Sequence, residues 1–165
     1  MPFETDAGNA EMGLNCYLVR LTTDDVPLLQ PLENEVNLAF WGKENYRRFL
    51  EEYPEYFGCK AVTLADSGRE QLVGFFLARA IYESLEILKV GVFSECQRQG
   101  IGTQLMEMAY AEGIRRGCTR CFLEVRKSNQ AAIQFYYSHN FRIAGTRFNY
   151  YTDPVEDAWI MDRSL

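Results

Sequence analysis

The pattern of apolar and polar positions predicts alternating strands and helices along the 165 residues. Short runs rich in apolar and β-branched residues are typical of strands, and they lie at 14–21, 60–65, 72–81, 85–93, 121–125, 141–151 and 158–162. Apolar residues three and four positions apart indicate helices, which are expected at 22–40, 44–52, 100–116 and 129–138. The order β-α-α-β-β-β-α-β-α-β-β predicts an α/β sandwich around a mixed sheet.

Local signals mark several ends of these elements. The run Thr22-Thr-Asp-Asp supplies a cap and an acidic first turn for the first helix, and Pro31 is expected to break that helix. Asp66-Ser-Gly68 predicts a hairpin turn, and Gly117 is expected to stop the helix that begins at Gly100.

The segment Gln97-Arg-Gln-Gly-Ile-Gly-Thr103 lies between a predicted strand and a predicted helix. The first N–H groups of a helix lack intrahelical partners and carry partial positive charge, so they can bind phosphate. Gly100 and Gly102 would let an anion approach the backbone, although such a glycine pair can also form only a tight turn. Leu105 stands where a dinucleotide fingerprint needs its third glycine, and no lysine follows Gly102 as a P-loop requires.

Several motifs together resemble the GCN5-related N-acetyltransferase (GNAT) superfamily. Gln97-x-x-Gly100-x-Gly102 resembles its acetyl-CoA pyrophosphate loop. Further along the chain, the superfamily's last cofactor-contacting strand and helix are matched by Leu123–Asn129, Ala132–Tyr136 and Phe141. Within the superfamily, RimI-type ribosomal-protein alanine N-acetyltransferases resemble the chain at Asn149–Tyr151, Glu156–Ala158 and Met161.

The resemblance covers residues 71–161, whereas the first 60 or so residues match only in pattern. It implies the acyl-CoA N-acyltransferase fold, a mixed and mostly antiparallel sheet flanked by helices. That sheet would be splayed between two central parallel strands, at 85–93 and 121–125. We expect a flexible tail at 1–13 and a single acetyltransferase domain at 14–165.

The resemblance implies that acetyl-CoA is the cosubstrate. Its pantetheine arm would pair with the strand at Val90, Gly91 and Val92, and the N–H of Val92 would polarise the thioester oxygen. Gly91 fits a bulge that splays the strand, but it could instead accommodate a neighbouring side chain. The other implied cofactor contacts are Gln97, Arg98, Gln99, Gly100, Ile101, Gly102, Thr103, Asn129 and Tyr136.

The implied catalytic residues are Glu124, as general base, and Tyr136, which would donate a proton or a hydrogen bond to the departing sulfur. Position alone would make Tyr136 a core aromatic, while Glu124 could instead form a salt bridge with Arg126 on the same strand face. Asn129 could be an ordinary helix N-cap, a cofactor contact or both. His139-Asn140-Phe141 replaces the family's Leu-Gly-Phe, and Asn140 can adopt the left-handed conformation that glycine would supply.

Composition narrows the partners. The net charge of −6 disfavours DNA or RNA as a partner and would suit a basic peptide or amine, although it could also serve only to keep the protein in solution. No apolar run is long enough for a membrane span, and the N-terminus does not resemble a signal peptide. An odd number of cysteines, five, indicates reduced cytoplasmic thiols, and with a single histidine the chain does not support a four-ligand zinc site. Cys118 and Cys121 have the spacing of a redox motif, but they are expected between a helix end and a strand start and not at a helix N-terminus.

We therefore expect a cytoplasmic acetyltransferase, as a monomer or weak dimer, that modifies a protein N-terminal α-amine. The resemblance implies the N-terminal alanine of a ribosomal protein as the acceptor. Acetylation of lysine or of a small amine, such as a polyamine or aminosugar, stays open. A CoA-binding regulatory module without turnover is the alternative outside the enzymes.

Overall fold

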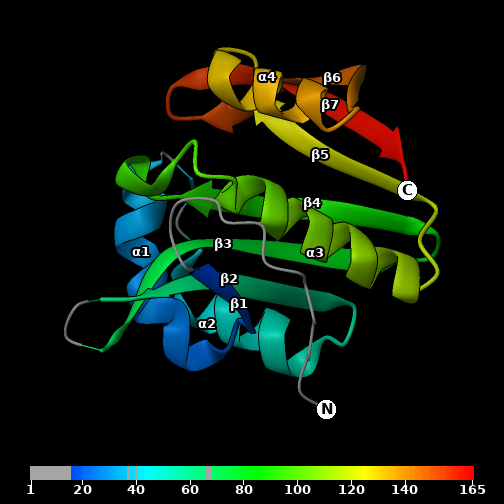
Figure 1. The fold of residues 1–165 in the computed structure, drawn as a ribbon. Coiled ribbons are helices and arrows are strands. Elements are labelled where there is room, and N and C mark those ends of the chain that lie inside the picture. Colours follow the sequence, from blue (N-terminus) through cyan, green and yellow to red (C-terminus); the bar gives the residue numbers. More distant parts are fainter. Residues whose placement is uncertain (1–15, 37, 40, 66–67) are drawn as a thin grey trace. The chain divides into compact units, whose positions relative to one another are not determined.

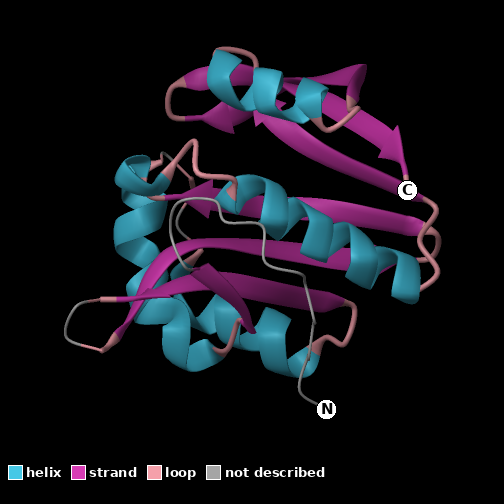
Figure 2. Cartoon of the chain, in the orientation of Figure 1, coloured by secondary structure: helices cyan, strands magenta, loops and turns pink. Residues whose placement is uncertain are grey.

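A computed structural model describes residues 16–36, 38–39, 41–65 and 68–165, in which strands and helices follow the predicted order (Figure 1). The strands are β1 (Cys16–Arg20), β2 (Tyr56–Leu64), β3 (Glu70–Ile81), β4 (Ser84–Val92), β5 (Arg120–Arg126), β6 (Arg142–Thr152) and β7 (Val155–Ser164). The helices are α1 (Val26–Glu35), α2 (Gly42–Arg47), α3 (Ile101–Arg115) and α4 (Gln130–Ser138) (Figure 2). Three short segments are also helical, namely the 3-10 helices η1 (Thr23–Asp25) and η3 (Ser94–Cys96) and the π-helix η2 (Arg48–Glu52).

The strands form one mixed sheet in the order β1-β2-β3-β4-β5-β7-β6, and a mixed sheet is what the sequence predicts. The chain divides into two compact units, residues 1–77 with 89–109 and residues 78–88 with 110–165. Strands β3 and β4 and helix α3 each contribute residues to both units. The single domain at 14–165 stays a prediction, and the predicted tail at 1–13 lies outside the described residues.

In the first unit, α1 begins after the predicted cap, where Asp25 accepts hydrogen bonds from both the amide and the hydroxyl of Thr22, each at 2.9 Å. The predicted break at Pro31 is wrong, because the proline lies inside α1. A proline removes one hydrogen bond of the helix ladder. Leu29 and Leu32 on either side are fully buried, so packing against the core offsets that loss.

The second unit contains the only parallel pairing described between neighbouring strands, that of β4 with β5. It runs from Ser84↔Arg120 to Ile87↔Leu123 and ends there, although β5 continues to Arg126. On its other edge β5 pairs antiparallel with β7 along its whole length, and β7 pairs antiparallel with β6. The sheet is thus mostly antiparallel, with a short parallel ladder at its centre, as predicted.

Two predicted helix ends are confirmed by backbone geometry. Gly117 follows α3 with φ +88°, and the amide of Cys118 donates to the carbonyl of Gly113 at 2.9 Å, which closes the helix. Asn140 has φ +64°, the left-handed conformation expected of it, and the amide of Phe141 donates to the carbonyl of Tyr136 at 3.0 Å. Asparagine therefore replaces the family's glycine without loss of the turn.

Candidate functional site

The predicted cofactor loop lies in the first unit, between the end of β4 and the start of α3. Arg98 and Gly100 both have left-handed φ values, +62° and +82°, which reverse the chain just before the helix. Since α3 begins at Ile101, the amides of Ile101 and Gly102 have no carbonyl partner one turn earlier in the helix. The helix dipole adds partial positive charge there, so this loop can bind an anion.

Side chains fix the shape of this loop from within. Gln97 donates from Nε2 to the carbonyl of Val92 at 3.0 Å, and Gln99 donates from Nε2 to the carbonyl of Glu95 at 3.2 Å. Gln97 thus anchors the loop to the end of β4. The Arg98 side chain is exposed and makes no hydrogen bond or ion pair with the residues that the structure describes, so it is available to a phosphate.

A carboxylate holds the start of the loop. The amide of Ser94 donates to Oε1 of Glu35 at 2.7 Å, and this bond lowers the pKa of Glu35. The carboxylate therefore stays ionised, and the bond intact, throughout the neutral pH range.

Gly91, where the resemblance places the pantetheine arm, accommodates neighbouring side chains. A Cβ atom added at Gly91 would lie 3.1 Å from Cγ2 of Val36 and 3.3 Å from Cδ1 of Leu38. Both of these residues follow or end α1, so the chain after α1 packs directly on this part of β4. Close packing is reason enough for a glycine here, and the bulge stays a prediction.

In the second unit, Glu124 is held by an ion pair. Its Oε1 accepts a hydrogen bond from Nη1 of Arg147 on β6 at 2.6 Å, and the Glu124 side chain is 14% exposed against 53% for Arg147. The proposed salt bridge with Arg126 is wrong. Arg126 instead reaches the turn between β6 and β7, where it pairs with Glu156 at 3.2 Å and donates to the carbonyl of Asp153 at 2.9 Å.

Tyr150 is a second neighbour of Glu124. Burial, followed by a hydrogen bond with Glu124, raises the pKa of Tyr150 to about 12. The guanidinium of Arg147 lies over the Tyr150 ring, 4.4 Å from its centroid. The Glu124 carboxylate thus faces one cation and one phenol, in a part of β5 that is only slightly exposed.

Tyr136 lies on α4 and is 8% exposed, whereas Tyr137 beside it is 42% exposed, as their helical positions predict. Its ring packs edge-on against Phe141, with 5.8 Å between centroids. No residue in the described part of the chain accepts a hydrogen bond from its hydroxyl. Burial raises the pKa of Tyr136, so it stays protonated at neutral pH and can donate to a ligand.

Asn129 is the N-cap of α4, and its Oδ1 accepts a hydrogen bond from the amide of Ala132 at 3.1 Å. The cap interpretation is confirmed, and a cofactor contact stays a prediction. His139 at the other end of α4 lies with its ring 4.5 Å from that of Phe135, and its carbonyl accepts from Arg163.

The cysteines are free thiols in this structure. Cys118 lies in the loop after α3 and Cys121 on β5, as expected for structural cysteines rather than a redox motif at a helix N-terminus. Burial raises the pKa of Cys121 to about 12, which makes its thiol a poor nucleophile. The described residues contain no group of three potential metal ligands, nor a helix with the length and hydrophobicity of a membrane span.

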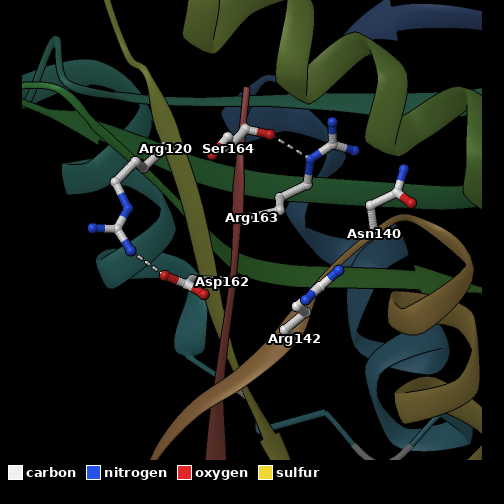
Figure 3. A pocket seen from close by; sticks show the side chains of 6 residues that line it. All are labelled: Arg120, Asn140, Arg142, Asp162, Arg163 and Ser164. Atoms are coloured by element: carbon white, nitrogen blue, oxygen red, sulfur yellow. Dashed lines mark hydrogen bonds and ion pairs between the residues drawn. The ribbon is translucent and has the colours of Figure 1, made fainter.

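A depression of about 560 Å³ in the second unit is separate from the predicted residues (Figure 3). Two of its arginines are engaged, Arg120 by Asp162 and Arg163 by stacking 4.5 Å over the ring of Tyr110. Its lining consists of Arg120, Asn140, Arg142, Asp162, Arg163 and Ser164. None of these was predicted as a site residue.

The sequence interpretation missed two groups of residues. Arg147 donates to Glu124 from β6, where Tyr150 also lies, and only the pairing of β6 with β7 brings Arg147 there. Lys89 and Glu33 form a buried ion pair in the first unit. A lysine inside the apolar run Leu85–Phe93 was a visible signal of that pair.

Known proteins resemble this chain in both sequence and fold. Residues 26–141 match the Acetyltransferase (GNAT) family. The chain is 32% identical to the ribosomal protein bS18-alanine N-acetyltransferase of Escherichia coli strain K12, over 86% of this chain and 92% of that protein. The crystal structure of the ribosomal-protein-S18-alanine N-acetyltransferase from Escherichia coli superposes with a TM-score of 0.75 at 28% identity, covering 90% of this chain and 93% of that chain. Ard1 from Thermoplasma volcanium shares the fold, with a TM-score of 0.78 at 21% identity over 91% of this chain and 97% of that chain.

Proposed function

The chain belongs to the GNAT acetyltransferase family, and we propose that it transfers an acetyl group from acetyl-CoA to the N-terminal alanine of ribosomal protein bS18. The relative in Escherichia coli is named for this reaction and is similar over most of both chains, which supports the proposal. A ribosomal-protein acceptor would place the reaction in the cytoplasm.

The observation that carries the proposal is the setting of Glu124. Its carboxylate is only slightly exposed and is oriented by the guanidinium of Arg147, which donates to Oε1 at 2.6 Å. An oriented carboxylate can accept a proton from an ammonium group, directly or through water. A protein that only bound CoA would need no such group.

The remaining residues fit the binding of acetyl-CoA. When bound, acetyl-CoA supplies the acetyl group as an activated thioester. The amides of the loop at Ile101 and Gly102 would hold its pyrophosphate, with Arg98 as a further cation. The Tyr136 hydroxyl would donate a hydrogen bond to the sulfur, because a phenol with a raised pKa stabilises a developing thiolate without losing its proton.

The pKa of the acceptor favours an N-terminal amine over lysine. An α-amine has a pKa of about 7.7–8.0 and a lysine about 10.4, so deprotonating lysine at neutral pH costs about 3–4 kcal/mol more. One carboxylate base suits the first task better than the second.

Release of free CoA thiol, followed over time with different acceptors, tests the proposal. We expect release with a peptide that carries the N-terminal sequence of bS18, and none with the same peptide already acetylated at its α-amine. A lysine-containing peptide with a blocked N-terminus and spermidine serve as competing acceptors. Preferred turnover of either would refute the proposed substrate, and no turnover with any acceptor would favour a CoA-binding regulatory module.

A further inference from the structure

A buried lysine joins three parts of the first unit. The Lys89 side chain on β4 is 3% exposed, and its ammonium contacts both the carboxylate of Glu33 on α1 and the carbonyl of Ala39. The ammonium also lies 4.6 Å from the ring centroid of Trp41 and 5.3 Å from that of Tyr46 on α2. We call these five residues the Lys89 cluster.

The Lys89 cluster places two charged side chains, Lys89 and Glu33, inside the core, where apolar side chains could have been packed instead. Glu33 and Tyr46 are fully buried, and the Tyr46 hydroxyl donates to Oε1 of Glu33 at 2.6 Å. The second oxygen of Glu33 is buried without a hydrogen-bond partner among the described residues. A buried ion pair of this kind contributes little stability compared with well-packed apolar side chains. Its geometry, which ties a strand to a backbone carbonyl and two rings, is what an apolar side chain could not reproduce.

The segment after α1 that Lys89 contacts also packs on Gly91. Lys89 and Gly91 are two positions apart and share a face of β4. Val36 and Leu38 lie against Gly91, and the Ala39 carbonyl, one residue later, accepts from Lys89. Val36, Leu38 and Ala39, which we call the link after α1, are therefore attached to β4 at two nearby points, by close packing and by charge.

We propose that Lys89 is a positioning residue for acetyl transfer: it fixes Val36, Leu38 and Ala39 beside Gly91 and so shapes the acceptor side of the reacting centre. This role rests on the proposed function and on the pairing of the pantetheine arm with Val90, Gly91 and Val92 that the family resemblance implies. The cofactor loop at 97–102 is attached to β4 separately, through Gln97. Loss of Lys89 should therefore impair use of the acceptor far more than binding of acetyl-CoA.

Replacement of the polar groups by apolar ones separates positioning from stability. Lys89→Met alone leaves Glu33 buried without its cation, and we expect it to unfold at a lower temperature. The apolar variant Glu33→Leu/Tyr46→Phe/Lys89→Met removes both buried charges and the Tyr46 hydroxyl, leaves only the Ala39 carbonyl without its donor, and should regain most of that stability. If Lys89 positions the link, the apolar variant still loses about tenfold or more in kcat/KM for the acceptor peptide, because small displacements near the reacting atoms are costly. Its Kd for acetyl-CoA should stay within about twofold of the parent.

Lys60→Met is the matched control. Lys60 forms another partly buried pair, with Asp25 at 2.6 Å, but it does not belong to the Lys89 cluster. We expect it to lower stability without changing KM for the acceptor. Trp41→Leu, which removes one ring and keeps the ion pair, should raise KM for the acceptor even if the apolar variant does not fold.

Two results would overturn this role. They are parent-like kcat/KM in the apolar variant or in Trp41→Leu, and an equal loss of acceptor and acetyl-CoA binding. A parent protein that binds acetyl-CoA but acetylates no amine would instead refute the proposed function, and the role of Lys89 with it.

Discussion

Glu124 on β5 and Arg147 on β6 form an ion pair, with 2.6 Å between Oε1 and Nη1, across the intervening strand β7. The register supports this contact, because Glu124 is opposite Ile160 and Arg147 is opposite Ala158, two residues earlier on β7. The pair allows two roles for Glu124. Glu124 can be a general base that Arg147 orients, or it can have only the structural role of linking β5 to β6. The two roles predict different effects of substitution.

Glu124→Gln should lower kcat/KM by about 100-fold or more at pH 7, because a general base contributes on that scale. The loss should be greatest at low pH, where the acceptor amine is mostly protonated. The melting temperature should change little, since Arg147 is half-exposed and such pairs contribute little to stability. Steady-state kinetics and a thermal melt check both statements. Arg147→Gln is the control, and we expect it to have a similar melting temperature and a smaller loss of activity. Full activity of Glu124→Gln at pH 7 would show that Glu124 has only a structural role.

Tyr136→Phe should lower kcat by about 10- to 100-fold, because a hydrogen bond to a charged group is worth about 1.5–3 kcal/mol. The hydroxyl is needed as charge develops on sulfur, so the Kd for acetyl-CoA should hardly change. Tyr137→Phe, one residue along α4 on an exposed side chain, should leave both parameters at parent values. Calorimetry and steady-state kinetics separate the two; unaltered kcat in Tyr136→Phe would remove this residue from the chemistry.

Gly100→Asp should weaken acetyl-CoA binding by at least about tenfold, since a carboxylate would repel the pyrophosphate at the helix N-terminus. The substitution also strains a backbone with φ +82°. Gly117→Asp controls for that strain, because Gly117 has φ +88° and an added Cβ there meets nothing within 4 Å. Calorimetric titration with CoA should show a loss in the first variant only. Equal affinities for the two would contradict an anion site at this loop.

The pH dependence of kcat/KM should rise to a plateau near pH 8, following deprotonation of the acceptor α-amine with its pKa of about 7.7–8.0. Burial and the hydrogen bond with Glu124 raise the pKa of Tyr150 to about 12, and burial also raises that of Tyr136. Both phenols therefore stay protonated to pH 10, and no fall in rate is expected there. A decline between pH 8 and 10 that Tyr150→Phe abolishes would contradict this assignment. A rate that keeps rising to pH 10 would indicate a lysine acceptor.

Local rules predict most of the elements and little of the contact network. Gly117 and Asn140 adopt left-handed conformations as their positions after helices require, and the cap at Thr22 depends only on the next three residues. Pro31 misled the prediction, because propensity favours a break while the burial of Leu29 and Leu32 favours a continuous helix. Packing between elements outweighs local preference there.

The site residues show the same limit. The motifs indicate Glu124 and Tyr136 as candidate catalytic residues. The ion-pair partner of Glu124, Arg147, follows from the register of β6 and β7, which the hydrophobic periodicity of the sequence does not determine. Arg126 has the right spacing on β5 and contacts the turn between β6 and β7 instead. Gly91 could be explained from sequence in two ways, and only the placement of Val36 and Leu38 shows the side chains that it accommodates.

Mass-spectrometric localisation of the acetyl group on the product tests the central claim most directly. The purified protein is incubated at pH 7.5 with acetyl-CoA and an alanine-starting bS18 peptide that also contains lysine, and the product is fragmented. The account predicts one acetyl group, on the α-amine of the alanine, at a rate that falls sharply in both Glu124→Gln and Tyr136→Phe. Acetylation at lysine, or an unmodified peptide under conditions in which the protein binds acetyl-CoA, would contradict it.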